Sequence, residues 1–267
     1  MAPSRDDGAD AVARLDELTR RLRRECPWDR EQDEKSIVPH TVEEAYELAD
    51  AAQRGDDAKL LDELGDVLFQ VHFLALLLEE RGAGSLADVA DHVRQKLIHR
   101  HPHIFGEGPP ASSPVPEVET AGDVLRNWDA IKRDEPGRER GIFGEVPENL
   151  PGPLYARKVQ RRAASTGFDF DHVPYDAIEA ELEELREAKG RDEAFHEIGD
   201  VLFAATNVAR KLHVDPELAL RASADRFRGR VEAAERLARE HGAEWEELGP
   251  DQQLGYYAQA RLQEQQP

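Results

Sequence analysis

The chain has 267 residues, enough for one large or two small domains, and a hydrophobic fraction of 39%, which is sufficient for a packed core. Its net charge of −21 argues against nucleic acid and against an anionic membrane as partners, because both attract basic surfaces. The sequence contains neither a signal-peptide pattern nor an apolar run long enough to cross a bilayer, and its single cysteine excludes an internal disulfide. These features predict a cytoplasmic protein.

The apolar residues of the first half recur with helical spacing, and no alternating strand pattern is present, which predicts an all-α fold. We expect Thr41 and Glu44 to form a capping box that starts the second helix. A stretch rich in proline and glycine, residues 101–118, is expected to be an exposed loop. The predicted helices of this half cover residues 9–24, 41–54, 58–81, 85–100 and 123–133.

The second half repeats the first. Glu-Leu-Gly-Asp-Val-Leu-Phe at residues 63–69 matches Glu-Ile-Gly-Asp-Val-Leu-Phe at residues 197–203 in six of seven positions. A repeat of this length indicates a duplicated domain rather than a solenoid unit. We therefore expect two tandem helical bundles, residues 9–133 and 153–265, joined by a linker over residues 134–152. The predicted helices of the second half cover residues 153–166, 176–189, 192–212, 215–241 and 251–263.

Each half carries four carboxylates arranged as two pairs with i, i+3 spacing. Because residues three apart share a helix face, two packed helices would aim all four carboxylates at one spot. Such a cluster repels itself unless it holds a cation, so the pattern predicts a metal site. The predicted ligands are Glu44, Glu47, Glu63 and Asp66 in the first half and Glu181, Glu184, Glu197 and Asp200 in the second.

Two alternatives to this metal site can be weighed from the sequence. Acidic residues number 56 of 267, so a single carboxylate is expected on any solvated face, whereas the same four positions filled twice are not. A di-iron bundle would need a Glu-x-x-His motif in each half, and the sequence has it only at Glu193 and His196. Ligands that are all carboxylate oxygens favour Mg²⁺, with Mn²⁺ as a substitute, over Zn²⁺.

A glycine lies inside each repeated motif, at Gly65 and Gly199. Glycine within a helix costs about 1 kcal/mol relative to alanine. Its recurrence predicts that a neighbouring helix or a ligand approaches closely at this position.

A Mg²⁺ site on four carboxylates typically serves phosphate chemistry, which also requires cations. In each half, one helix carries two basic residues four positions apart, and a later helix carries an aromatic residue with a basic residue four positions on. We expect the aromatic ring to stack on a base and the cations to neutralise phosphates, although each residue alone is equally typical of core packing or a snorkelling side chain. These residues are Lys96, Arg100, Trp128 and Lys132, and then Arg226, Arg230, Tyr257 and Arg261.

Taken together, the motifs resemble a known family. Glu-Glu-x-x-Glu at residues 43–47, followed by Glu-x-x-Asp at residues 63–66, resembles the signature of the MazG nucleoside triphosphate pyrophosphohydrolases. Cys-Pro-Trp-Asp at residues 26–29 and Arg-His-Pro-His-Ile-Phe at residues 100–105 are similar to other segments of that family. The resemblance covers nearly the whole chain, including the tandem arrangement.

The resemblance implies an all-α fold of the NTP pyrophosphatase type and a role in cleansing the nucleotide pool. The implied reaction is Mg²⁺-dependent cleavage of (d)NTPs between the α- and β-phosphates, giving a nucleoside monophosphate and pyrophosphate. It further implies that the eight carboxylates bind Mg²⁺ and that the protein is a homodimer. The implied catalytic residues are Glu44, Glu47, Glu63 and Asp66.

The second half departs from the family pattern, because Ala180 stands where the first glutamate of the motif belongs. The first half therefore has the fuller motif, and the sequence leaves open which half is active and which nucleotide is the substrate. Two other functions remain: a regulatory module that binds nucleotides or alarmones without turnover, and a helical scaffold with acids on its surface. The filled set of ligand positions favours the enzyme.

Overall fold

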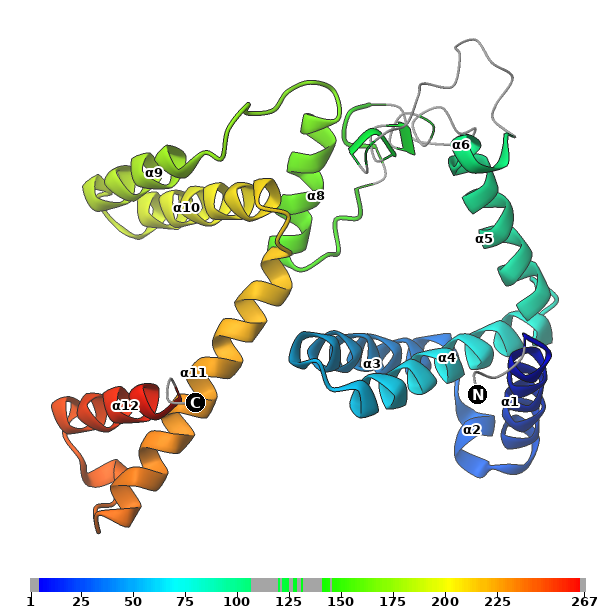
Figure 1. The fold of residues 1–267 in the computed structure, drawn as a ribbon, viewed down its shortest axis with the longest axis horizontal. Coiled ribbons are helices and arrows are strands. Elements are labelled where there is room, and N and C mark those ends of the chain that lie inside the picture. Colours follow the sequence, from blue (N-terminus) through cyan, green and yellow to red (C-terminus); the bar gives the residue numbers. More distant parts are fainter. Residues whose placement is uncertain are drawn as a thin grey trace. The chain divides into compact units, whose positions relative to one another are not determined.

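The computed structural model describes residues 5–106, 120, 122–124, 127, 128, 131, 141–144 and 146–264, except for the side chains of residues 5 and 6. Every regular element in these ranges is a helix, which confirms the all-α expectation (Figure 1). The chain divides into two units, residues 1–135 and 136–267. None of the helices in the described ranges is both long and apolar enough to cross a membrane.

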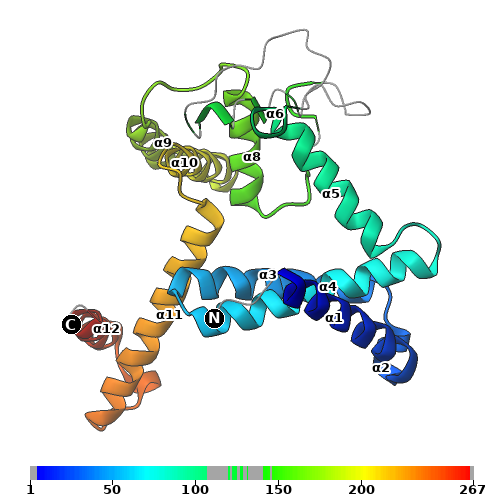
Figure 2. The same cartoon turned by 45° about the vertical axis from the view of Figure 1, so that its right-hand side comes forward.

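The first unit is organised around two long antiparallel helices, α3 and α4, which lie side by side in Figures 1 and 2. Gly55 ends α3 in the left-handed conformation, φ 67°, and Asp56 caps α4 directly afterwards. Ile37, Phe73 and Leu77 form the buried core of this pair. The helices of the unit are α1 (Arg5–Glu25), α2 (Pro27–Glu31), α3 (Glu34–Arg54), α4 (Asp57–Glu80), α5 (Leu86–Arg100) and α6 (Pro102–Phe105).

The start of α3 differs from the sequence expectation. The helix begins at Glu34, because Asp33 and Ser36 form a reciprocal capping box, with Ser36 N donating to Asp33 Oδ1 over 2.8 Å. Pro39 is accommodated inside the helix. The capping box expected at Thr41 is therefore wrong: the Thr41 hydroxyl donates to the Ile37 carbonyl, one turn back in the same helix, at 3.3 Å.

Two further expectations concern the end of this unit. Residues 102–105 form the short helix α6 within the segment expected to be a loop, which corrects that expectation at this point. Residues 122–124, 127, 128 and 131 are helical, in agreement with the helix expected over 123–133. Residues 107–118, 125, 126, 129, 130, 132 and 133 lie outside the described ranges.

The second unit is built around a similar antiparallel pair, α9 and α10, with Gly190 at the junction. Helix α8 packs on α10, and Gln160 Nε2 donates to the Phe203 carbonyl over 2.8 Å. Asp215 caps α11, accepting from the backbone nitrogens of residues 217 and 218. The helices are α8 (Gly152–Ala164), α9 (Tyr175–Glu187), α10 (Arg191–Lys211), α11 (Pro216–Glu240), the 3-10 turn η1 (Trp245–Glu247) and α12 (Pro250–Glu264).

The repeated motif occupies equivalent places in the two units. Residues 63–69 lie in α4 and residues 197–203 lie in α10, and each of these helices packs against the preceding long helix of its unit. The domain bounds 9–133 and 153–265, with a linker over 134–152, remain a prediction.

Candidate metal centres

The first cluster of carboxylates lies where α3 meets the N-terminal half of α4. Glu44, Glu63 and Asp66 each offer one oxygen, and the three oxygens lie within 4.8 Å of one another. Glu63 is buried, with 1% of its surface exposed, whereas Asp66 is exposed. Oxygens gathered at this spacing suit a hard divalent cation.

The charge on this cluster is high for its surroundings. The pKa of Glu44 is raised, mainly by burial and next by the charge of Asp66. A hydrogen bond with Glu63 raises this pKa further. Carboxylates held this close favour the neutral form of one member unless a cation is present. The arrangement therefore has the electrostatic character of a cation site.

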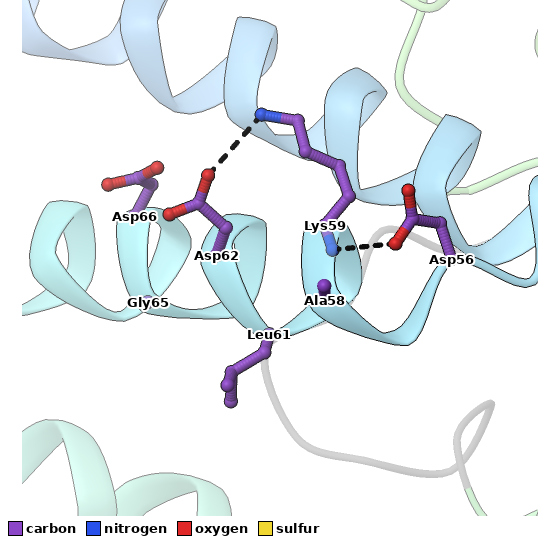
Figure 3. A pocket seen from close by; sticks show the side chains of 7 residues that line it. All are labelled: Asp56, Ala58, Lys59, Leu61, Asp62, Gly65 and Asp66. Atoms are coloured by element: carbon purple, nitrogen blue, oxygen red, sulfur yellow. Dashed lines mark hydrogen bonds and ion pairs between the residues drawn. The ribbon is translucent and has the colours of Figure 1, made fainter.

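Lys59 supplies one positive charge to this cluster. Its ammonium group is ion-paired with Glu63 Oε1 and lies 3.9 Å from Glu47 Oε2. It also lies 3.4 Å from Asp62 Oδ2, an interaction drawn in Figure 3. The hydrogen bond to Glu63 is the main reason that the pKa of Lys59 is raised. Glu47, the fourth predicted ligand, is exposed and lies outside the group of three gathered oxygens.

An open groove of about 630 Å³ runs beside the cluster along α4. In Figure 3 the carboxylates of Asp62 and Asp66 lie on one side of the helix, and Leu61 points to the other. Gly65 lines the groove, and a Cβ added there would meet no described atom within 4 Å. Gly199 is equally open. Within the described part of the chain, no neighbouring helix therefore packs closely against either glycine.

The second cluster joins α9 and α10. Glu181, Glu184 and Glu197 each offer one oxygen, again within 4.8 Å of one another. Asp200 lies outside this group of three oxygens. The pKa of Glu181 is raised, mainly by burial and then by the charges of Glu184, Asp200 and Glu197, so Asp200 still acts on the group electrostatically. By the register of the repeat, Glu193 takes the place that Lys59 has in the first unit, so the second cluster lacks the equivalent ammonium group.

The candidate substrate residues of the first unit gather around Trp128. The Arg100 guanidinium, in a residue only 8% exposed, lies 5.4 Å from the Trp128 ring centroid, and His101 meets the same ring edge-on at 5.0 Å. Lys96 is partly buried on α5. Lys132 lies outside the described residues.

A similar group forms in the second unit. Arg230 Nε lies 2.7 Å from Glu264 Oε2. The pKa of Arg230 is raised, mainly by the hydrogen bond with Glu264 and next by a hydrogen bond with Tyr257. Tyr257 also packs against Phe227, with ring centroids 5.8 Å apart. Arg226 donates to Ser223 Oγ, and Arg261 is exposed. In both units the aromatic ring therefore meets the arginine of the earlier helix, a pairing that sequence spacing alone did not indicate.

Among the described residues, the predicted metal ligands and the predicted substrate-binding residues lie on different helices within each unit. The first cluster lies in the N-terminal half of α4, whereas α5, which carries Lys96 and Arg100, departs from the C-terminal end of α4 (Figure 1). In the second unit the carboxylates lie on α9 and α10, whereas Tyr257 lies on α12, which packs on α11. Sequence reasoning missed the role of Lys59, although its position four residues before Glu63 was a signal for this ion pair.

Two antiparallel helix pairs, each with gathered carboxylate oxygens, place the chain in the class of all-α proteins with carboxylate sites suited to metal ions. Residues 32–105 match the family described as the MazG nucleotide pyrophosphohydrolase domain. This match spans α3, α4, α5 and α6 and so contains the first cluster.

Curated relatives extend the similarity to both units. The chain is 38% identical over 239 residues to the nucleoside triphosphate pyrophosphohydrolase/pyrophosphatase MazG of Thermotoga maritima, covering 88% of this chain and 89% of that protein. It is 35% identical over 246 residues to the nucleoside triphosphate pyrophosphohydrolase of Escherichia coli, covering 87% and 90%. The chain belongs to the MazG family and is an enzyme of the hydrolase class.

Proposed function

We propose that this protein hydrolyses nucleoside and deoxynucleoside triphosphates between the α- and β-phosphates, releasing a nucleoside monophosphate and pyrophosphate. The observation that carries the proposal is the gathering of Glu44, Glu63 and Asp66 oxygens within 4.8 Å. Membership of a family of nucleotide pyrophosphohydrolases supports the same reaction class.

The donor set fits Mg²⁺, with Mn²⁺ as a substitute, because every donor is a carboxylate oxygen. Burial and then the neighbouring charge of Asp66 raise the pKa of Glu44, and a bound cation would offset both effects. When bound, the metal would polarise phosphate oxygens and acidify a water molecule. The proposed holders are Glu44, Glu47, Glu63 and Asp66 in the first unit and Glu181, Glu184, Glu197 and Asp200 in the second.

The carboxylates themselves perform two further tasks in this proposal. They fix the position of the triphosphate relative to the attacking water, and one of them accepts the proton that the water loses. We assign the catalytic role to the first unit, where the motif has all its glutamates: Glu44, Glu47, Glu63 and Asp66. Lys59 must then give up its ion pair with Glu63 when the substrate complex forms.

We further propose that the working form is a homodimer, in which a second copy contributes to each carboxylate site. The arginine–aromatic groups lie on helices other than those that carry the carboxylates. The apolar stripe of α4 is also uncovered: Leu61 is 74% exposed, and Leu64, Leu68 and Val71 are exposed as well. Burying such a stripe against a second copy is favourable, at about 25 cal/mol per Å² of apolar surface.

The test is product analysis after incubation with dNTPs and Mg²⁺. A dNMP and pyrophosphate are the expected products, whereas a dNDP with orthophosphate would contradict the proposal. Glu47→Ala and Glu184→Ala, tested separately, assign turnover to one unit, and loss in the first variant alone is the expected result. Nucleotide binding without product would instead favour a regulatory binding module.

A further inference from the structure

A cavity of about 400 Å³ lies in the second unit, between α8, α10 and the segment that follows α8. None of the eight proposed metal ligands is among the described residues that line it, so it shares no wall with the candidate metal centres. Its volume lies within the range of about 300–1,000 Å³ that is usual for sites that bind small molecules.

Aromatic rings form much of the cavity wall. Phe143 comes from the turn before α8, Phe203 comes from α10, and Phe168 and Phe170 come from the segment after α8. Gly167 turns the chain at the end of α8, in the left-handed conformation with φ 94°. Phe168 is 81% exposed, and the other three rings are each about half exposed. Four exposed rings around one cavity indicate a surface that binds a partner molecule.

The segment after α8 is anchored to α10, so the aromatic wall is already in place. Asp169 is ion-paired with Arg210, and Lys211 Nζ lies 3.4 Å from the same carboxylate. Lys211 also donates to the Phe170 carbonyl. These contacts neutralise Asp169 and Arg210, the two charged residues that line the cavity. The cavity therefore suits a neutral ligand better than a carboxylate or a phosphate.

One buried polar group at the cavity lacks a partner. Gln160 lines the cavity and is 7% exposed. Its Nε2 donates to the Phe203 carbonyl over 2.8 Å, which fixes the orientation of the amide. Its Oε1 is buried and accepts no hydrogen bond from the described residues. A buried acceptor without a donor is unfavourable, so a ligand that brings a donor to Gln160 is favoured.

These three features together define the chemistry of the ligand. Rings pack well against the edges and faces of other rings, so the phenylalanine wall favours an aromatic ligand. A purely apolar ligand would leave Gln160 Oε1 buried and unpaired, and a charged ligand would lose its hydration without gaining a counter-charge. The ligand that satisfies all three features is a neutral aromatic molecule with one N–H or O–H group.

We propose that this cavity is a binding site for a neutral aromatic molecule of one or two rings that carries a hydrogen-bond donor. The ring lies among the phenylalanine side chains, and its N–H or O–H group donates to Gln160 Oε1. This site goes beyond the proposed function, because it needs neither metal, nor phosphate, nor turnover. Its walls come from α8, α10 and the segment between α8 and α9, so an occupied cavity stabilises the second unit by mass action.

The test uses indole as the probe, with benzothiophene as a partner of nearly the same shape that lacks the N–H group. Saturation-transfer NMR titrations on the full-length protein in EDTA measure both affinities without metal or nucleotide. Indole is expected to bind, and benzothiophene to bind about three- to tenfold more weakly, as expected for the loss of one hydrogen bond. Indole that shows no saturable binding, or benzothiophene that binds equally well, would overturn the proposal.

A filling variant tests the location of the site. Ala163 lines the cavity, so Ala163→Leu places a larger side chain inside it and is expected to weaken indole binding at least about tenfold. Ala205→Leu makes the same exchange at an exposed position of α10 outside the cavity and is the matched control. Unchanged indole binding in Ala163→Leu would overturn the location.

A second variant tests the hydrogen bond and guards against poor folding of the first. Gln160→Met removes the acceptor at similar size, so indole and benzothiophene are expected to bind this variant with equal affinity. An undiminished preference for indole in Gln160→Met would overturn the assigned role of Gln160.

Two further measurements separate this site from other occupants and from the proposed function. Addition of dATP with Mg²⁺ is expected to leave indole bound, and displacement of indole would overturn a site independent of the nucleotide. Wild-type protein that binds no indole but loses mass in light scattering on Ala163→Leu would show that a second copy fills the cavity, which also overturns it. Absence of (d)NTP hydrolysis would contradict the proposed function and leave the indole result standing.

Discussion

Lys59 and Glu63 form an ion pair within the first carboxylate cluster, one helical turn apart on α4. The glutamate is buried, whereas the lysine stem reaches in from the open groove. The ammonium group provides the charge compensation that a divalent cation would otherwise give. The second cluster has Glu193 at the equivalent position, so the two clusters differ in charge although their carboxylates match.

Removing the Lys59 ammonium group should make the thermal stability of the first unit more dependent on bound metal. We expect Lys59→Gln to lower the melting temperature in EDTA, because the carboxylates then repel without compensation, and to enlarge the rise in melting temperature that Mg²⁺ produces. Differential scanning fluorimetry with and without Mg²⁺ measures both. Lys35→Gln, at an exposed position on α3, is the control. Equal Mg²⁺ responses in the two variants would show that Lys59 does not offset the cluster.

The buried member of the cluster should matter more than its exposed neighbour. Glu63→Gln removes a charge from a site that is 1% exposed, and we expect apparent Mg²⁺ affinity to fall about 10- to 100-fold. Asp62→Asn, one residue earlier and exposed, is the matched control. Titration of Mn²⁺ by electron paramagnetic resonance measures the affinity without reference to turnover. Equal losses in both variants would indicate a diffuse acidic surface rather than a site.

The fold was largely predictable from periodicity and capping residues. The capping box at Ser85 and the cap at Asp215 are typical signals, and both helices start where these residues indicate. The start of α3 was not predicted, because two capping patterns compete in the sequence and the choice between Asp33 and Thr41 depends on whether Pro39 is tolerated inside the helix.

The candidate sites were predictable only in part. Spacing along a helix indicated which carboxylates share a face, and the structure gathers three of the four in each unit. The spacing of residues along one helix does not indicate the distance between that helix and another. The separation of Arg100 on α5 from the carboxylate cluster on α3 and α4 was therefore not predicted.

Two arginine clamps should make the attachment of α1 to α4 sensitive to acid. Arg20 donates two hydrogen bonds to Glu79, and Arg23 donates two to Glu80. These bonds are the main cause that lowers the pKa of each glutamate. A lowered folded-state pKa contributes stability above the unfolded-state value, about 4.3, and this stability is lost as the pH falls through the folded-state value.

We therefore expect the stability of the wild-type protein to decline as the pH falls below about 5, and a Glu79→Gln, Glu80→Gln variant to show a shallower decline. Urea unfolding at a series of pH values measures the difference. High salt weakens these partly exposed pairs, so the contrast between the two proteins should shrink in about 1 M NaCl. Parallel curves for both proteins at low salt would exclude the clamps as the cause.

The exposed stripe of α4 should determine oligomeric state and activity together. Leu64→Glu places a charge in the middle of this stripe, where Leu64 is half exposed in one copy, and we expect the dimer to dissociate. Light scattering after size-exclusion chromatography measures the mass, and the (d)NTP assay measures the activity. Val12→Glu, at a similarly exposed position on α1, is the control. Activity should return with dimer content as protein concentration rises, since mass action restores the second copy. A fully active monomer would show that one copy of the chain completes its own site.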